Sequence, residues 1–170
     1  MKKVLVIGAD GAGKDTFADI LSKATGLSYD SMAGSTSRAI LYKHFAQNVT
    51  NLTDLEEIYR NRRNNREEWF EAGERLRNQD KCALLRWCFN RGDIATGVRT
   101  IEEIEEAKKQ TIVDVILWVE RPGYVSKTFG IGFQHDRLVD SVIMNDENID
   151  GLVWHAHRVA YKHKLYSWMQ

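Results

Sequence analysis

A glycine-rich stretch directly after a short apolar run constrains the fold of this chain more than any other feature. Residues 3–7, KVLVI, are typical of a buried strand, and residues 8–16, GADGAGKDT, follow at once. Three glycines in one turn allow backbone angles that other residues avoid. Apolar residues at 17, 20, 21 and 24 then recur at helical spacing until Gly26 ends the pattern. The sequence therefore predicts a strand, a tight turn and a helix.

The same turn has the composition of a phosphate-binding loop. It fits the pattern G-x-x-x-x-G-K, with Gly8, Gly13 and Lys14 at the fixed positions. In such loops backbone N–H groups and the helix N-terminus surround phosphate oxygens, and the lysine reaches the β- and γ-phosphates. The alternative is a glycine-rich turn without a ligand. The residues that we expect to bind the nucleotide here are Gly8, Asp10, Gly11, Ala12, Gly13, Lys14, Asp15 and Thr16.

Asp15 occupies the position where this pattern normally has the serine or threonine that binds Mg²⁺. A carboxylate can bind the ion itself or one of its waters, so Asp15 is the predicted metal ligand. The alternative is an acidic residue favoured by the positive end of the helix dipole, and both roles can hold at once. Thr16 then supplies a hydroxyl next to the phosphates.

The rest of the chain alternates between expected strands and helices. Further strands are predicted at 27–30, 93–98, 112–120 and 138–144, and helices at 35–49, 53–78, 80–90, 100–110 and 149–163. This alternation favours an α/β fold with a five-stranded parallel sheet, helices on both faces and the ligand at the carboxyl ends of the strands. At 170 residues and 43% hydrophobic content, we expect one domain over residues 1–170.

Composition excludes several other classes of protein. Lysine plus arginine equals aspartate plus glutamate at 24 each, so no overall positive field exists to hold a polyanion, and a local basic patch is left open. Cys82 and Cys88 lack the spacing of metal or redox motifs and are expected to be buried thiols. His155 and His157 do not form a zinc motif, and no serine nucleophile elbow is present. The run VLVI is too short for a membrane span, so a cytoplasmic protein without a membrane partner is expected, and a homodimer is left open.

Four motifs together resemble one family of enzymes. These are GKDT (13–16), GVRTIEEIEEAKK (97–109), WVERPG (118–123) and DSVIMNDENIDGL (140–152). They resemble the phage-type deoxynucleoside monophosphate kinases, which belong to the P-loop kinase superfamily with adenylate and thymidylate kinases. The resemblance touches both ends and the middle of the chain. It implies a P-loop kinase fold, ATP and Mg²⁺ as donor, a nucleoside monophosphate as acceptor, and a mobile lid.

The resemblance also implies arginines that bind the acceptor's phosphate. Arg38 in STSR and Arg99 in GVR match such positions, although surface arginines at helix starts are the alternative. One departure is Gly97, which stands where these families usually have an aspartate. The second partner of the magnesium ion is therefore unassigned, with Asp93 as a weak substitute.

The predicted helix over 53–78 places two arginines on an apolar face. At helical spacing Arg62 and Arg66 interrupt a stripe that includes Trp69. An unpaired buried guanidinium is costly, so these arginines either bind an anion such as the acceptor's phosphate, pair with carboxylates, or extend to solvent. Trp69 is a candidate to stack on the acceptor base, with core packing as the alternative. The acceptor region would span about 35–91, with four further arginines, 60, 63, 75 and 77, in solvent.

Residues 120–137 match the segment that closes over ATP in the related kinases. Arg121 is the best candidate there to stabilise charge on the transferred phosphoryl group, ahead of Lys127 and Arg137, and a plain surface loop is the alternative. Together with Lys14 and Arg99, it forms the predicted catalytic set. Asn145 and Asp146, after the last strand, are expected to border the adenine pocket.

Three functions are compatible with these residues. The first is transfer of the γ-phosphate of ATP to a (deoxy)nucleoside monophosphate. The second keeps the donor site but phosphorylates a hydroxyl of a modified pyrimidine in phage DNA, with Asp10 or Asp15 as base, and only this alternative requires a nucleic-acid partner. The third is a non-catalytic nucleotide-binding module.

Overall fold

The computed structural model describes the chain except for residues 10, 30–31, 49–51, 99, 124–136, 147 and 170, and gives only the backbone for 32, 33, 35, 48 and 52. Its strands are β1 (Val4–Gly8), β2 (Ile94–Thr96), β3 (Val115–Glu120) and β4 (Ser141–Met144). Its helices are α1 (Lys14–Thr25), α2 (Met32–Lys43), α3 (Leu52–Arg60), α4 (Arg66–Gln79), α5 (Ala83–Phe89), α6 (Ile101–Lys109) and α7 (Ile149–His163). Short 3₁₀ segments lie at Phe45–Asn48, Asn61–Arg63 and Ser167–Met169.

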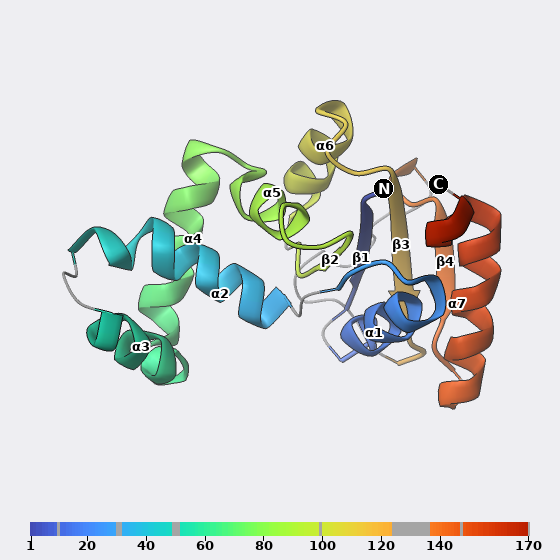
Figure 1. Cartoon of the computed structure of the whole chain (residues 1–170), viewed down its shortest axis with the longest axis horizontal. Helices are drawn as coiled ribbons and strands as arrows, with labels where there is room; N and C mark the ends of the chain where they lie inside the picture. The colour runs from blue at the N-terminus through green and yellow to red at the C-terminus, as the bar shows by residue number, and fades with distance from the viewer. Residues whose placement is uncertain are drawn as a thin grey trace.

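The strands form one parallel sheet in the order β2-β1-β3-β4 (Figure 1). The prediction of five strands is wrong for the described residues, because residues 27–29 contribute a single bridge between Tyr29 and Ile94. Ser28 bonds to Asp93 through both its backbone and its hydroxyl, and α2 begins at Met32. Between Ser28 and α2, the described part of the chain therefore pairs with β2 only at Tyr29.

Helices cover both faces of the sheet, as the sequence predicts. The two core clusters separate the alternating residues of β1. Val4 and Val6 pack with α1 and α7, whereas Leu5 and Ile7 pack with α5 and α6. This alternation is expected for a central strand, since successive side chains point to opposite faces. β1 is thereby fixed on both sides, which holds the turn that follows it.

A separate group of helices lies to one side of the sheet. Figure 1 shows α2, α3 and α4 in this position, and they share a third core cluster that includes Ile40, Leu55 and Trp69. The prediction of one helix over 53–78 is wrong, because the chain breaks between α3 and α4 at NRRNN, residues 61–65. Asparagine favours turns over helix interiors, and Asn65 has non-helical angles. The helix predicted from Ser35 instead begins at Met32.

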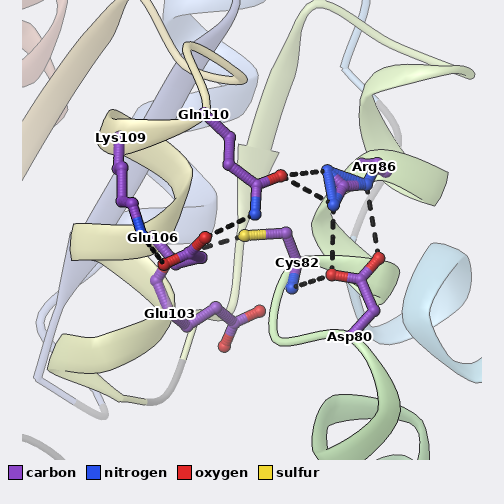
Figure 2. Close-up of polar contacts among 7 residues, drawn as sticks. All are labelled: Asp80, Cys82, Arg86, Glu103, Glu106, Lys109 and Gln110. Carbon is purple, nitrogen blue, oxygen red and sulfur yellow. Dashed lines mark hydrogen bonds and ion pairs between the residues drawn. The ribbon is translucent and has the colours of Figure 1, made fainter.

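A polar network joins the group of helices to α6. Figure 2 shows Arg86 of α5 between Asp80 and Gln110, and its Nη2 lies 3.1 Å from Asp80 Oδ1 and 2.8 Å from Gln110 Oε1. Cys82 lies beside this network, and burial raises the pKa of its thiol to about 11. Cys82 and Cys88 are both buried free thiols, which confirms the prediction. None of the helices in the described part of the chain is long and apolar enough to cross a membrane.

Candidate functional site

The turn between β1 and α1 has a backbone that only glycine accommodates at its ends. A Cβ on Gly8 would lie 2.3 Å from the carbonyl oxygen of Val119 in the neighbouring strand β3. Gly11 and Gly13 have φ angles of 79° and 91°, in the left-handed region that favours glycine. Gly13 is the N-cap of α1, so the first N–H groups of that helix face the turn. The predicted Asp10 lies outside the described residues.

A cavity of about 520 Å³ lies over this turn. It sits at the carboxyl ends of three neighbouring strands, because Gly8 ends β1, Arg121 follows β3 and Asn145 follows β4. The structure brings together many of the predicted site residues, and the lining consists of Gly11, Gly13, Lys14, Asp15, Thr16, Arg121, Asn145, Asn148, Ile149 and Leu152. The cavity therefore lies at the edge of the sheet where the sequence predicts a ligand.

Asn145 supports the turn directly. Its Nδ2 donates a hydrogen bond of 2.7 Å to the carbonyl of Ala12, and its backbone N–H donates to Glu120. A Cβ on Gly13 would lie 2.5 Å from the same Nδ2, so the side chain fits only against glycine. On the other side, Arg121 Nη1 lies 3.5 Å from the carbonyl oxygen of Gly11. The described geometry thus gives Asn145 a role in holding the turn.

Asp15 is bound by two hydroxyl groups from other parts of the sheet. Thr96 Oγ1 donates to Asp15 Oδ1 at 2.7 Å, and the Tyr29 hydroxyl donates to the same oxygen at 3.2 Å. Burial, with the neighbouring Asp15 as a smaller cause, raises the pKa of Tyr29 to about 12. The phenol is therefore protonated at neutral pH and serves as a donor.

The first turn of α7 forms the apolar end of the cavity. Leu152 is buried, but Ile149 is 57% exposed and faces the cavity instead of the core. Val153, the residue after Leu152, is 36% exposed, so the apolar side chains of α7 do not all face the core. The sequence reasoning missed Asn148, whose side chain caps α7 by accepting a hydrogen bond from Gly151. An asparagine before a helical pattern signals a cap, but it does not reveal a cavity.

The predicted acceptor residues of the helical group do not line this cavity. Because the helix breaks at 61–65, Arg62 and Arg66 do not share one continuous apolar face. Arg62 stacks on Tyr59, 4.1 Å from the ring centroid, and donates to its carbonyl. Trp69 is 7% exposed and packs against Phe45 and Tyr59, so its side chain belongs to the core of the helical group.

The other arginines of this group fall in different surroundings. Arg66 lines a second hollow of about 400 Å³ that also includes Glu67, Glu68 and Glu71, a composition that disfavours an anion. Arg38 lies within α2, partly buried, and Arg99 lies outside the described residues, as does most of the predicted lid, including Lys127. Arg137, at the end of the lid range, is described and exposed.

Two further side chains differ from the sequence expectations. Arg77, expected in solvent, has a side chain only 11% exposed and pairs with Glu74 and Glu103. Asp93 precedes β2 and therefore lies at the opposite end of the strand from the cavity. Burial tends to raise the pKa of Asp93, but hydrogen bonds from Ser28 and Lys3 outweigh it and hold the pKa below its usual range. Asp93 therefore joins Ser28 and Lys3 through hydrogen bonds, away from the cavity.

Among the described residues, no group of three or more histidine, cysteine, aspartate or glutamate side chains could hold a metal ion by itself. Mg²⁺ is commonly bound through one or two carboxylates together with substrate phosphates and water. A single carboxylate, Asp15, beside a cavity with Lys14 and Thr16 fits binding of Mg²⁺ together with substrate phosphates.

No protein-family model matches this chain, and no curated protein matches it.

Proposed function

We propose that this protein is an ATP-dependent kinase of the P-loop type that transfers the γ-phosphate to a (deoxy)nucleoside monophosphate. The observation that carries the proposal is the cavity in which Lys14, Asp15 and Thr16 meet Arg121 at the N-terminus of α1. Two cationic side chains and a helix N-terminus suit a polyphosphate. The topology agrees, because ligands of open α/β sheets bind at the carboxyl ends of the strands.

The lining residues divide into roles along a bound ATP. Backbone N–H groups of the turn and Lys14 would bind the β- and γ-phosphates, and Arg121 would stabilise charge on the transferred phosphoryl group. Asp15 would hold Mg²⁺, which supplies neutralisation of phosphate charge when bound, and Thr16 would place its hydroxyl next to the phosphates. Ile149 and Leu152 offer an apolar wall to the adenine ring.

The acceptor needs little chemical activation. The attacking oxygen of a nucleoside monophosphate is already ionised at neutral pH, so positioning and charge neutralisation supply the rate. We assign the acceptor's phosphate to Arg38 and Arg99 on the strength of the sequence resemblance. The geometry gives no support to the same role for Arg62, Arg66 or Trp69, which are engaged elsewhere or lie among carboxylates.

ATP consumption tests the proposal against a panel of acceptors: dGMP, dTMP, dCMP, dAMP and hydroxymethylated DNA. We expect turnover with at least one free nucleotide. Turnover with DNA alone would replace the proposal with phosphorylation of a base hydroxyl. Saturable binding of ATP without turnover on any acceptor would leave a non-catalytic nucleotide-binding module.

Two substitutions separate the donor and acceptor sides. Lys14→Ala should abolish transfer to every acceptor, because the γ-phosphate loses its cation. Arg38→Ala should mainly raise KM for the acceptor while ATP affinity stays near the wild-type value. Lys23→Ala, on the exposed face of the same helix as Lys14, is the matched control and should change neither quantity. An equal loss of ATP affinity in the Lys14 and Arg38 variants would contradict the assignment of Arg38.

A further inference from the structure

The two oxygens of the Asp15 carboxylate have different surroundings. Oδ1 accepts hydrogen bonds from both Thr96 and Tyr29, at 2.7 and 3.2 Å. Oδ2 accepts no hydrogen bond from the residues that the structure describes, and Asp15 lines the cavity next to Lys14 and Thr16. One oxygen is therefore held by the protein, and the other is left for a ligand.

The two hydroxyl groups that hold Oδ1 are themselves fixed by the sheet. Thr96 is fully buried at the end of β2, and its backbone pairs with Val6 of β1. A buried hydroxyl needs a hydrogen-bond partner, and Asp15 provides it. Tyr29 forms a parallel bridge with Ile94, so it approaches Asp15 from the next segment along the sheet. Pairing within the sheet thus fixes the backbone of both donor residues.

We propose that Thr96 and Tyr29 are positioning residues that orient Asp15, so that its Oδ2 binds the divalent cation of the bound nucleotide or one of that cation's waters. This inference rests on the proposed function, since the cation arrives with ATP. The physical reason is that a carboxylate in place of the usual hydroxyl brings a full negative charge close to the phosphates. Two donors on Oδ1 draw that charge away from the phosphates and fix the direction of Oδ2.

Electron paramagnetic resonance of Mn²⁺, in the presence of a non-hydrolysable ATP analogue, measures the cation site without requiring turnover. Removing an outer partner of a metal ligand typically weakens metal binding 10–100-fold. We expect Thr96→Val to weaken Mn²⁺ binding roughly tenfold, and Tyr29→Phe to weaken it less, because its hydrogen bond is longer. Thr96→Ser retains the hydroxyl and should restore binding.

Matched controls lie far from the cavity. Thr25→Val removes a buried hydroxyl that donates to Leu21, and Tyr166→Phe removes a phenol bonded to His157. Both should leave Mn²⁺ affinity unchanged. In an Asp15→Asn background, Thr96→Val should cause no further loss of Mn²⁺ affinity, because the oriented carboxylate is already gone. An additive loss would overturn the proposal, since it would show that Thr96 acts by another route.

Analogue binding in the presence of EDTA separates this inference from the proposed function. If the wild type binds the analogue but Thr96→Val and Tyr29→Phe keep wild-type Mn²⁺ affinity, the positioning role is overturned and the kinase proposal stands. If the wild type binds no analogue, both are overturned. If circular dichroism shows that Thr96→Val does not fold, the single variants Tyr29→Phe and Thr96→Ser test the positioning role instead. Tyr29 lies outside the four strands, so its substitution leaves their pairing intact.

Discussion

At the residue scale, close contacts between distant segments build the turn over which the cavity lies. Gly8 meets Val119, and Gly13 meets Asn145, each with no room for a Cβ. Asn145 reaches back 133 residues to bond with Ala12. The same side chain therefore fixes the turn and requires glycine beside it. A change at Gly13 should disturb the cavity through Asn145 as well as through the backbone.

Gly13→Ala tests this coupling, with Gly123→Ala as the matched control. Both glycines have left-handed φ angles, 91° and 82°, so each alanine should lower the free energy of unfolding by about 1–2 kcal/mol. Only the Gly13 variant also clashes with Asn145 Nδ2, since no atom of the described residues lies within 4 Å of the place that a Cβ on Gly123 would take. Losing the Asn145 hydrogen bond should add ~1 kcal/mol to the loss of stability in the Gly13 variant. Urea denaturation measures both, and equal losses would contradict the coupling.

The sequence predicted the residues of the turn but not their partners. Gly8, Lys14 and Asp15 follow from local spacing, which the motif fixes. Thr96, Tyr29 and Asn148 carry no local signal of their place at the site. They reach it through the order and register of the strands and the docking of α7. Those contacts are set by the assembled sheet and cannot be derived from spacing along the chain.

At the element scale, the strength of the local pattern decided which predictions succeeded. The strands at 93–98, 112–120 and 138–144 exist but are shorter, as Ile94–Thr96, Val115–Glu120 and Ser141–Met144. Apolar runs show that a strand exists, whereas its ends depend on its neighbours in the sheet. The helix over 53–78 failed because its periodicity continues through NRRNN, where asparagines favour a break.

The carboxyl end of α7 should make stability depend on pH. His163 Nε2 lies 2.9 Å from Ser141 Oγ of β4. Burial, then the nearby Lys162, lowers the pKa of His163 below 6.5, with Lys2 acting in the same direction and Asp140 opposing. The unfolded chain thus binds this proton more readily than the folded chain. The free energy of unfolding should be undiminished above pH 6.5. It should fall as the pH drops below 6.5 and through the pKa of His163 in the folded chain.

Urea denaturation on both sides of pH 6.5 checks this dependence. His163→Gln keeps a polar side chain but cannot titrate, so it should show a smaller loss of stability on acidification than the wild type. His157→Gln, on the exposed side of the same helix, is the control and should keep the wild-type dependence. An identical dependence in the His163 variant would assign the acid sensitivity to other groups.

At the scale of the whole molecule, α5 and an ion pair join the helical group to the sheet. Leu84 packs into the core of the helical group, and the adjacent Leu85 packs into the core under the sheet. Arg77 of α4 pairs with Glu103 of α6 at 3.5 Å, and the Glu103 side chain is 4% exposed. If the helical group carries the acceptor, as proposed, these contacts set its position relative to the cavity.

Arg77→Met should therefore destabilise the protein strongly, because it leaves the buried Glu103 carboxylate without this cation. Losing one partner of a buried ion pair costs about 3–5 kcal/mol. The control is Arg75→Met on the same helix, whose pair with Glu71 is more than half exposed and contributes about 1 kcal/mol or less. The double variant Arg77→Met/Glu103→Met should recover much of the loss, because an apolar pair needs no counter-charge. Urea denaturation of the four proteins, wild type included, measures the coupling, and similar losses for Arg77→Met and Arg75→Met would show that the two parts are held together by packing alone.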